Sequence, residues 1–168
     1  MRVTSFVLAL VVLLAGCNQQ PQRQPKMSDA QISRLHRELP GLTDECLDKI
    51  KWDGIQAMPA ETDKCFKMLP ASRWRGLWRR DLETSVFCPA PEKECPSGRA
   101  TYPLLLEFRR GSEPPGIGAD TPLGGLYAVD FIGRRTAHGG IYGDGAGAQA
   151  LVVDRLISIR EIEAPRKE

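Results

Sequence analysis

The stretch Arg73-Trp-Arg-Gly-Leu-Trp-Arg-Arg80 marks the point where the chain changes from a helical to a strand-like pattern. At a period of two residues, Trp74, Gly76 and Trp78 share one face of an extended strand. The opposite face carries three charged side chains, Arg73, Arg75 and Arg79. Because large aromatic side chains gain most by leaving water, we expect the tryptophan face to be buried.

Further strands are expected after this one, separated by loops rich in proline and glycine. Their predicted positions are Glu83–Cys88, Tyr102–Arg109, Leu126–Ile132 and Ala150–Ile162. In the last and longest, simple alternation predicts two faces: Val153, Arg155, Ile157 and Ile159 on one, and Val152, Asp154, Leu156, Ser158 and Arg160 on the other. Five or six mostly antiparallel strands predict a small barrel or curled sheet.

The segment before these strands has helical spacing. Ser28 as N-cap, with apolar residues at helical intervals before Pro40, predicts a short helix over Ser28–Leu39. Thr43 is expected to cap a second helix from Asp44 to about Lys51, and a third is expected over Pro59–Leu69 with Phe66 and Leu69 facing inward. The predicted fold class is therefore α+β, with short N-terminal helices followed by a small antiparallel β-barrel-like sheet of five or six strands.

Four cysteines, Cys46, Cys65, Cys88 and Cys95, form an even set that we expect to pair as disulfides. Four cysteines allow three pairings, and the sequence leaves the choice open. A local Cys88–Cys95 bridge is geometrically easy because the intervening run is rich in turn residues, and it would leave Cys46 with Cys65. A metal site is disfavoured because no spacing is C-x-x-C and both histidines lie in unrelated segments, so we predict neither a metal nor a cofactor.

The first residues have the composition of an export signal, with Arg2 followed by an apolar run from Phe6 to Ala15. That run is shorter than the roughly 20 residues a spanning helix needs. Leu14-Ala15-Gly16-Cys17 resembles the lipobox of bacterial lipoproteins. The resemblance implies cleavage before Cys17, acylation of Cys17, and anchoring of the chain in a lipid bilayer by two or more acyl chains.

Asn18 follows the modified cysteine, and in enteric lipoproteins that pattern implies transfer to the outer membrane. The next residues, NQQPQRQPK at 18–26, contain no apolar side chain and predict a flexible spacer. The expected organisation is a signal peptide over 1–16, a lipidated N-terminus and spacer over 17–27, and one globular domain over 28–168. Within that domain we expect a helical subregion over 28–70 and a β-barrel-like subdomain over 71–168.

The composition of the chain gives little drive toward charged polymers. The 168 residues carry a formal net charge of +2, which does not favour nucleic acid as a partner. The export signal argues against that partner as well. The arginines of the first strand could instead meet phosphate or carboxylate groups in the cell envelope, or they could be paired with nearby aspartate and glutamate.

Gly76-Leu77-Trp78 resembles the Gly-x-Trp signature of lipocalin-like barrels. In those barrels an arginine from the last strand packs on the tryptophan, and the resemblance implies that role for Arg155 or Arg160. The resemblance covers three residues and carries no ligand with it. A glycine that permits close packing beside a core tryptophan is the alternative interpretation.

No recognisable catalytic set accompanies the remaining polar residues. His138 is the one candidate general base, with Asp144 and Asp154 as candidate orienting partners, but no nucleophile motif is present. The glycine-dense run Gly139–Ala148 is predicted to be a hairpin loop, because a strand rather than a helix is expected after it.

These features predict a non-catalytic binding or assembly module that faces the periplasm and contacts an unidentified envelope protein, glycan or lipid. The candidate binding surface comprises Arg73, Arg75, Arg79, His138, Tyr142 and Asp144. We predict no catalytic residue. The alternatives are a small envelope hydrolase that uses His138, and an inhibitor that inserts the glycine-rich loop into a wall-degrading enzyme.

Overall fold

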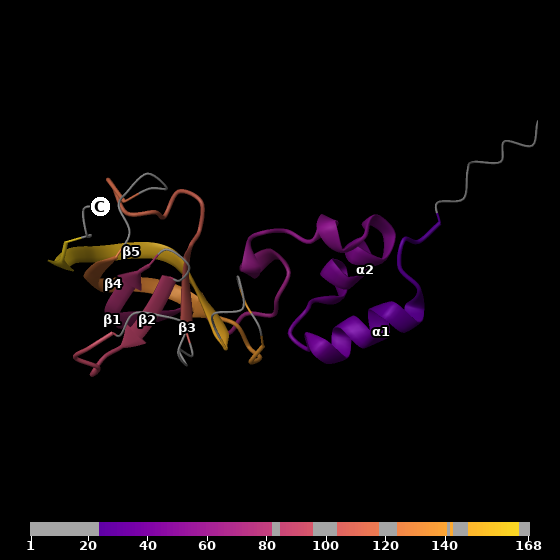
Figure 1. Cartoon of the computed structure of the whole chain (residues 1–168), viewed down its shortest axis with the longest axis horizontal. Coiled ribbons are helices and arrows are strands. Elements are labelled where there is room, and N and C mark those ends of the chain that lie inside the picture. The colour runs from indigo at the N-terminus through magenta and orange to yellow at the C-terminus, as the bar shows by residue number, and fades with distance from the viewer. Residues whose placement is uncertain are drawn as a thin grey trace, which may run out of the picture.

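A computed structural model of the chain describes residues 24–81, 85–95, 104–117, 124–140, 142 and 148–164. Helices gather at one end of the molecule, where the described chain begins, and the strands form a barrel at the other end (Figure 1). The predicted α+β class with a small barrel is confirmed. The predicted signal peptide, Cys17 and the first part of the predicted spacer lie outside the described residues.

The first two helices form where the sequence predicts them. α1 (Asp29–Glu38) begins after Ser28, whose hydroxyl accepts a hydrogen bond from the Gln31 backbone while the Gln31 side chain accepts one from the Ser28 backbone. This reciprocal pair satisfies amide groups that the first helical turn leaves free. α2 (Asp44–Asp53) begins after Thr43, whose hydroxyl accepts from the Cys46 backbone N–H at 3.2 Å.

The predicted third helix over Pro59–Leu69 is wrong. This segment holds only the short 3-10 turn η2 (Thr62–Lys64), which follows another, η1 (Ile55–Ala57). Phe66 forms an isolated bridge with Leu42, and Met68 forms one with Thr136. Because these long-range hydrogen bonds require an extended chain, tertiary pairing overrides the local helical pattern, and Leu69 is 37% exposed rather than inward.

Five strands close into a barrel in the order β1-β2-β3-β5-β4. Their bounds are β1 (Ser72–Arg80), β2 (Ser85–Pro89), β3 (Leu104–Phe108), β4 (Gly125–Arg135) and β5 (Gln149–Glu163). All neighbouring pairs are antiparallel except β3 and β5, which run parallel. All five predicted strands are thus present, and their ends shift by a few residues at most.

Three register shifts between β4 and β5 break the predicted alternation of faces in the last strand. Each extra residue on β5 turns the following side chains to the other face of the strand. As a result Leu156 packs together with Val153 and Ile159 against the barrel core, whereas Ile157 is 43% exposed. The expectation that Val153, Ile157 and Ile159 share one face and Leu156 the other is therefore wrong.

Aromatic side chains fill the barrel, as the pattern of β1 predicts. Trp78 is buried and its indole N–H donates to the Ser85 hydroxyl at 2.9 Å, while Trp74 is partly buried against the same core. A methyl group on Gly76 would overlap the carbonyl oxygen of Cys88. Glycine is thus required at this position because the neighbouring strand approaches too closely for any side chain.

The two disulfides are Cys46–Cys65 and Cys88–Cys95, with Cα–Cα distances of 5.2 Å and 5.6 Å. This is the pairing in which the local bridge forms between Cys88 and Cys95. The first disulfide joins α2 to the residue after η2 within the helical subregion. The second ties β2 to the chain that follows it, and both bridges are buried.

A second apolar core joins the helical subregion to the barrel. It includes Leu42, Ile50 and Phe66 on the helical side together with Leu105 and Ala150 of the barrel. Both subregions therefore pack through one continuous set of buried side chains rather than through a linker. No helix in the described ranges is long and apolar enough to cross a membrane.

Candidate binding groove

The distal half of β5 has a strand partner on one side only. β3 ends at Phe108, opposite Val153, whereas β5 continues to Glu163. Beyond Val153 the only strand paired with β5 in the described parts of the chain is β4. The edge that faces away from β4 therefore presents backbone N–H and C=O groups without a strand partner.

A groove of about 480 Å³ runs beside this edge. Its walls are the loop after β3 and the first half of the free edge, comprising Gly111, Ser112, Glu113, Pro115, Asp154, Arg155, Leu156, Ile157, Ser158 and Ile159. The Ser112 hydroxyl lies 2.9 Å from the Val153 carbonyl and 2.8 Å from the Arg109 carbonyl, which fixes the loop where β3 ends. The volume lies within the range of ligand-binding sites.

A network of ion pairs includes Asp154, one of the residues that line the groove. Arg134 donates from Nη2 to Asp63 at 2.8 Å and to Asp154 at 2.8 Å, and Arg109 reaches Asp63 at 2.8 Å. Burial raises the pKa of the Asp63 carboxyl, but hydrogen bonds from Arg134 and Arg109 outweigh it and hold that pKa below its usual value. The hydrogen bonds from Arg134 to Asp154, and after them the one to Asp63, raise the pKa of Arg134. Burial lowers this pKa but does not outweigh them.

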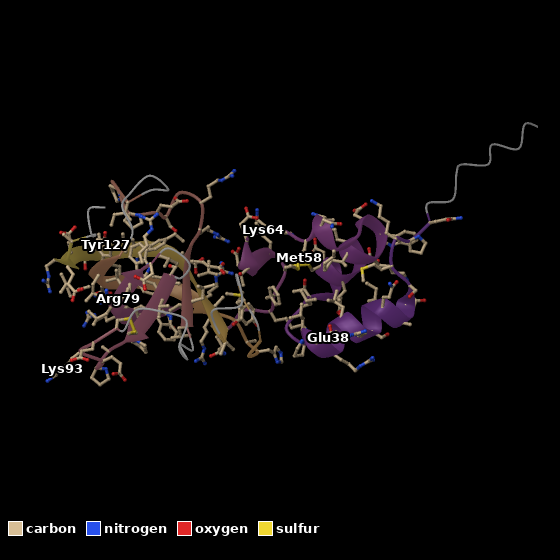
Figure 2. The ribbon with its side chains drawn as sticks, in the orientation of Figure 1. Glu38, Met58, Lys64, Arg79, Lys93 and Tyr127 are labelled. Atoms are coloured by element: carbon tan, nitrogen blue, oxygen red, sulfur yellow. A yellow bond between two sulfur atoms is a disulfide. The ribbon has the colours of Figure 1, made fainter. Side chains whose placement is uncertain are left out.

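Glu107 of β3 is hydrogen-bonded to the residue that precedes Asp63 in the chain. Its carboxylate accepts a hydrogen bond of 2.7 Å from the buried Thr62 hydroxyl. Burial raises the pKa of Glu107, partly offset by the hydrogen bonds from Thr62, and the nearby charge of Asp63 raises it further. Thr62, which binds Glu107, and Asp63, which binds Arg134, both belong to η2. Lys64 at the end of η2 lies between the helical subregion and the barrel in Figure 2.

The arginines of β1 are engaged by local partners. Arg73 and Arg75 both donate to Asp130 on β4, at 2.7 Å and 3.0 Å. The hydrogen bond from Arg73 is the largest cause that lowers the pKa of Asp130 to about 2. These two predicted surface residues, although half exposed or more, therefore already hold a carboxylate.

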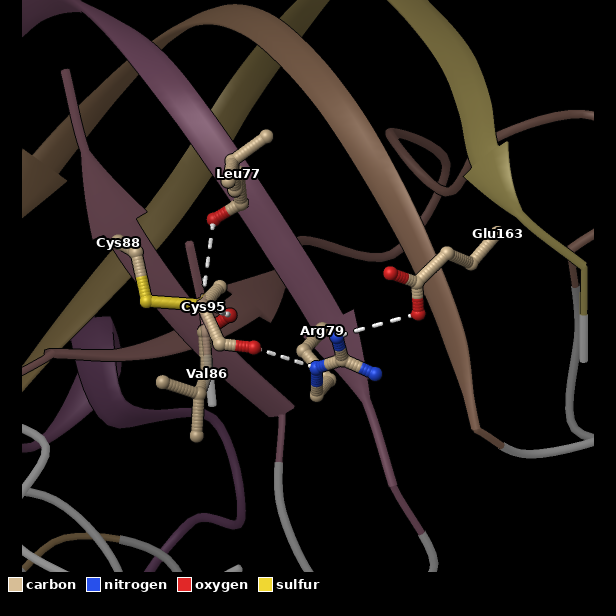
Figure 3. The surroundings of a disulfide bond; sticks show 6 residues. All are labelled: Leu77, Arg79, Val86, Cys88, Cys95 and Glu163. Carbon is tan, nitrogen blue, oxygen red and sulfur yellow. Dashed lines mark hydrogen bonds and ion pairs between the residues drawn. A yellow bond between two sulfur atoms is a disulfide. The ribbon is translucent and has the colours of Figure 1, made fainter. Parts of the chain in front are cut away.

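Arg79 is largely buried, with 15% of its side chain exposed. Its Nε donates to the Cys95 carbonyl at 2.5 Å and its Nη2 to Glu163 at 3.3 Å (Figure 3). Arg79 thus joins the Cys88–Cys95 disulfide loop to the end of β5. This structural role uses the guanidinium donors that a ligand would need.

Tyr142 is not a surface residue, which corrects one of the predicted binding positions. It is 3% exposed, its ring meets Phe66 edge-on at 4.9 Å, and its hydroxyl donates to the His138 carbonyl at 2.8 Å. The apolar contact with the helical subregion buries it. Asp144, together with most of the Gly139–Ala148 run, lies outside the described residues.

His138 is exposed on the chain that follows β4. Its candidate partner Asp154 is held by Arg134 instead, and His138 is not among the residues that line the groove. The lipocalin-like resemblance implied that Arg155 or Arg160 packs on Trp78. Both arginines are exposed on β5, and the rings that contact Trp78 within the described ranges are those of Phe108 and Tyr127. The described residues contain no group of three or more potential metal ligands.

The groove itself is absent from the sequence-based predictions. Its signal is a mismatch in strand length, since the pattern predicts a longer last strand than its neighbour could cover. The predicted site residues do not gather at the groove; Arg73, Arg75, Arg79, His138 and Tyr142 lie elsewhere. No family model matches the chain, and no characterised protein or solved structure shows significant similarity to it.

Proposed function

We propose that this protein is a lipoprotein of the bacterial cell envelope that acts as a non-catalytic binding or assembly module facing the periplasm. The proposed anchor is the acylated Cys17 at the end of the Leu14-Ala15-Gly16-Cys17 motif. Two acyl chains or more hold a protein stably on a bilayer. Asn18 after the cysteine favours the outer membrane.

Two disulfides support export to an oxidising compartment, where such bonds persist. The pairing leaves no thiol among the four cysteines of the described chain. The carboxylates Asp63, Asp130 and Asp154 all hold arginines, so none of them is free to act as a general base. These contacts favour a binding role over catalysis.

The observation that carries the binding role is the free half of β5 with the groove beside it. Exposed strand edges are sites where proteins add a further strand from a partner. Ile157 gives this edge an exposed apolar side chain that a bound partner would cover.

The anchor is tested by intact mass and detergent partitioning of the exported protein beside Cys17→Ser. We expect a chain that starts at Cys17, carries a lipid-sized mass increment and enters the detergent phase, whereas Cys17→Ser stays in water. An unlipidated chain would refute the anchor.

The binding role is tested by formaldehyde crosslinking in intact cells. We expect a crosslinked species that is lost in Ile157→Asp and kept in the control Ile55→Asp, because both isoleucines are 43% exposed but only Ile157 lies on the β5 edge. Loss in both variants or in neither would contradict the proposal.

A further inference from the structure

We propose that the helical end of this protein lies on the phospholipid surface through Trp52 and Ile55, with the barrel turned away from the bilayer. The inference rests on the proposed acylation of Cys17 and names the surface of the folded domain that meets the lipid. This surface, the entry face, consists of Lys26, Lys51, Trp52 and Ile55.

The described chain joins the fold at the entry face. The backbone N–H groups of Lys26 and Met27 both donate to the Lys51 carbonyl, at 2.9 Å and 3.1 Å. The Lys51 ammonium lies 2.7 Å from Asp29 at the start of α1 and 5.9 Å from the centre of the Trp52 ring. The incoming chain, the start of α1 and the end of α2 are therefore held together in the helical subregion, at the end of the molecule opposite the barrel (Figure 1).

The length of chain before this point keeps the entry face near the bilayer. From Cys17 to Lys26 a fully extended chain reaches at most about 30 Å. A short flexible tether also gives the tethered surface an effective concentration in the millimolar range. A contact with lipid that is too weak to bind a free protein therefore becomes populated once Cys17 is acylated.

Trp52 and Ile55 supply side chains that suit a lipid surface. The buried side chains of α2 are Cys46, Leu47 and Ile50. At about 3.6 residues per turn, Trp52 lies on the opposite side of the helix, where it is only partly buried. Ile55, just beyond the end of α2, is 43% exposed. Tryptophan concentrates at membrane–water interfaces because its ring is apolar and its N–H is polar, and lipid would also remove the apolar surface of Ile55 from water.

The charges around the entry face are balanced, which favours a lipid interface over a polyanion. Lys51 is paired with Asp29, and the Trp52 indole N–H donates to Asp48 at 3.1 Å. Lys26 is exposed, so its ammonium can stay at the level of the headgroups while its neighbours approach the acyl chains. The contact should therefore depend on apolar burial and form on lipid without net charge.

This orientation places the groove on the side away from the membrane. β5 runs away from the helical subregion toward the far end of the barrel (Figure 1). The groove beside residues 154–159 would then open toward the periplasm when the entry face lies on lipid. A partner in the periplasm could reach it without competing with the bilayer.

Quenching by lipid tests the contact. The full lipidated chain is reconstituted into phosphatidylcholine vesicles whose acyl chains carry bromine near the headgroups, where it quenches tryptophan on contact. The emission of Trp52, taken as the difference between wild type and Trp52→Phe, should be lost in brominated vesicles and kept in unbrominated ones. The remaining emission of Trp52→Phe comes from Trp74 and Trp78 in the barrel and should be the same in both.

A matched pair of variants tests the face. Ile55→Asp should restore the emission of Trp52 in brominated vesicles, because a carboxylate does not enter lipid. Ile162→Asp, at a position of 44% exposure near the far end of β5, should leave the quenching unchanged. Both variants keep Cys17, so the acyl chains still hold them on the vesicles, and Ile55→Asp leaves the β5 edge available to a partner.

The outcomes separate this inference from the proposed anchor. A lipidated chain that sediments with the vesicles but keeps its Trp52 emission would overturn the lipid contact and leave the anchor intact. The same holds if that emission is shifted to the blue without bromine quenching, because a second copy would then cover Trp52. A chain that carries no lipid and stays in solution would overturn both.

Discussion

Replacing Arg134 with methionine should destabilise the protein in a way that depends on pH. The guanidinium of Arg134 makes charged hydrogen bonds to Asp63 and Asp154, both at 2.8 Å, at the junction between η2 and the barrel. Methionine keeps much of the apolar stem of arginine but leaves both carboxylates without their main partner. The free energy of unfolding should therefore fall chiefly through electrostatics.

The size of the loss follows from burial and from the contacts that remain. Removing one member of a buried ion pair costs about 3–5 kcal/mol. The side chain of Asp63 is only 6% exposed, but Arg109 still reaches it at 2.8 Å, and the side chain of Asp154 is 20% exposed. Partial compensation and partial hydration place the expected loss at pH 7 at about 2–3 kcal/mol.

The pH dependence has a definite sign. In the wild-type protein the pKa of Asp63 is held below its usual value, so this carboxylate contributes stability above its unfolded pKa and loses it as the pH falls through the folded pKa. Arg134→Met removes much of that contribution. The difference in stability between wild type and variant should be largest at pH 7 and should shrink below about pH 4, where an unfolded aspartate takes up its proton.

Urea unfolding followed by tryptophan fluorescence, at pH 7 and at pH 3, measures this difference with the disulfides intact. Arg73→Met is the control, because Arg73 is half exposed and its partner Asp130 keeps Arg75. The control should cost much less than Arg134→Met. An equal loss in both variants, or the same loss for Arg134→Met at pH 3 and pH 7, would refute the reasoning.

Three further changes test other parts of the structure. Burial raises the pKa of Glu107, so stability that is present at low pH is lost as the pH rises through that raised pKa. Measured by the urea midpoint, Glu107→Gln should therefore be more stable than the wild type at pH 8 and no more stable than the wild type at pH 4. Gly76→Ala should lower stability by about 1–3 kcal/mol through overlap with the neighbouring strand, whereas Gly139→Ala, which meets only ordinary contacts, should have little effect on the melting temperature. Replacing both Cys46 and Cys65 with alanine should cost about 3 kcal/mol in chemical unfolding, against about 2.5 kcal/mol for the other disulfide, which closes a shorter loop; a reversed order would contradict the loop-entropy account.

Much of the fold could be predicted because its signals are local. The N-caps Ser28 and Thr43 start α1 and α2 through hydrogen bonds within one helical turn. The alternation in β1 depends only on neighbouring residues, and it places Trp78 in the core as predicted. The local Cys88–Cys95 bridge needs only a turn, and once it forms the remaining pairing is fixed.

The predictions that failed depend on partners distant in the sequence. The segment around Phe66 is extended because Leu42 and the end of β4 pair with it. Side chains of β5 change faces because β4 imposes three shifts of register. Tyr142 is buried because Phe66 from the helical subregion reaches it.

The same division holds for the candidate site. The sequence by itself carries the Leu14-Ala15-Gly16-Cys17 motif on which the proposed anchor depends, and it predicts the positions of the strands. Only the tertiary structure decides that β3 stops beside Val153, that Arg73 and Arg75 are held by Asp130 and that the distal half of β5 keeps an open edge. The reason is physical: a local pattern specifies which face of an element is apolar, but the length and register of its neighbours decide which backbone groups and charges are left for a partner.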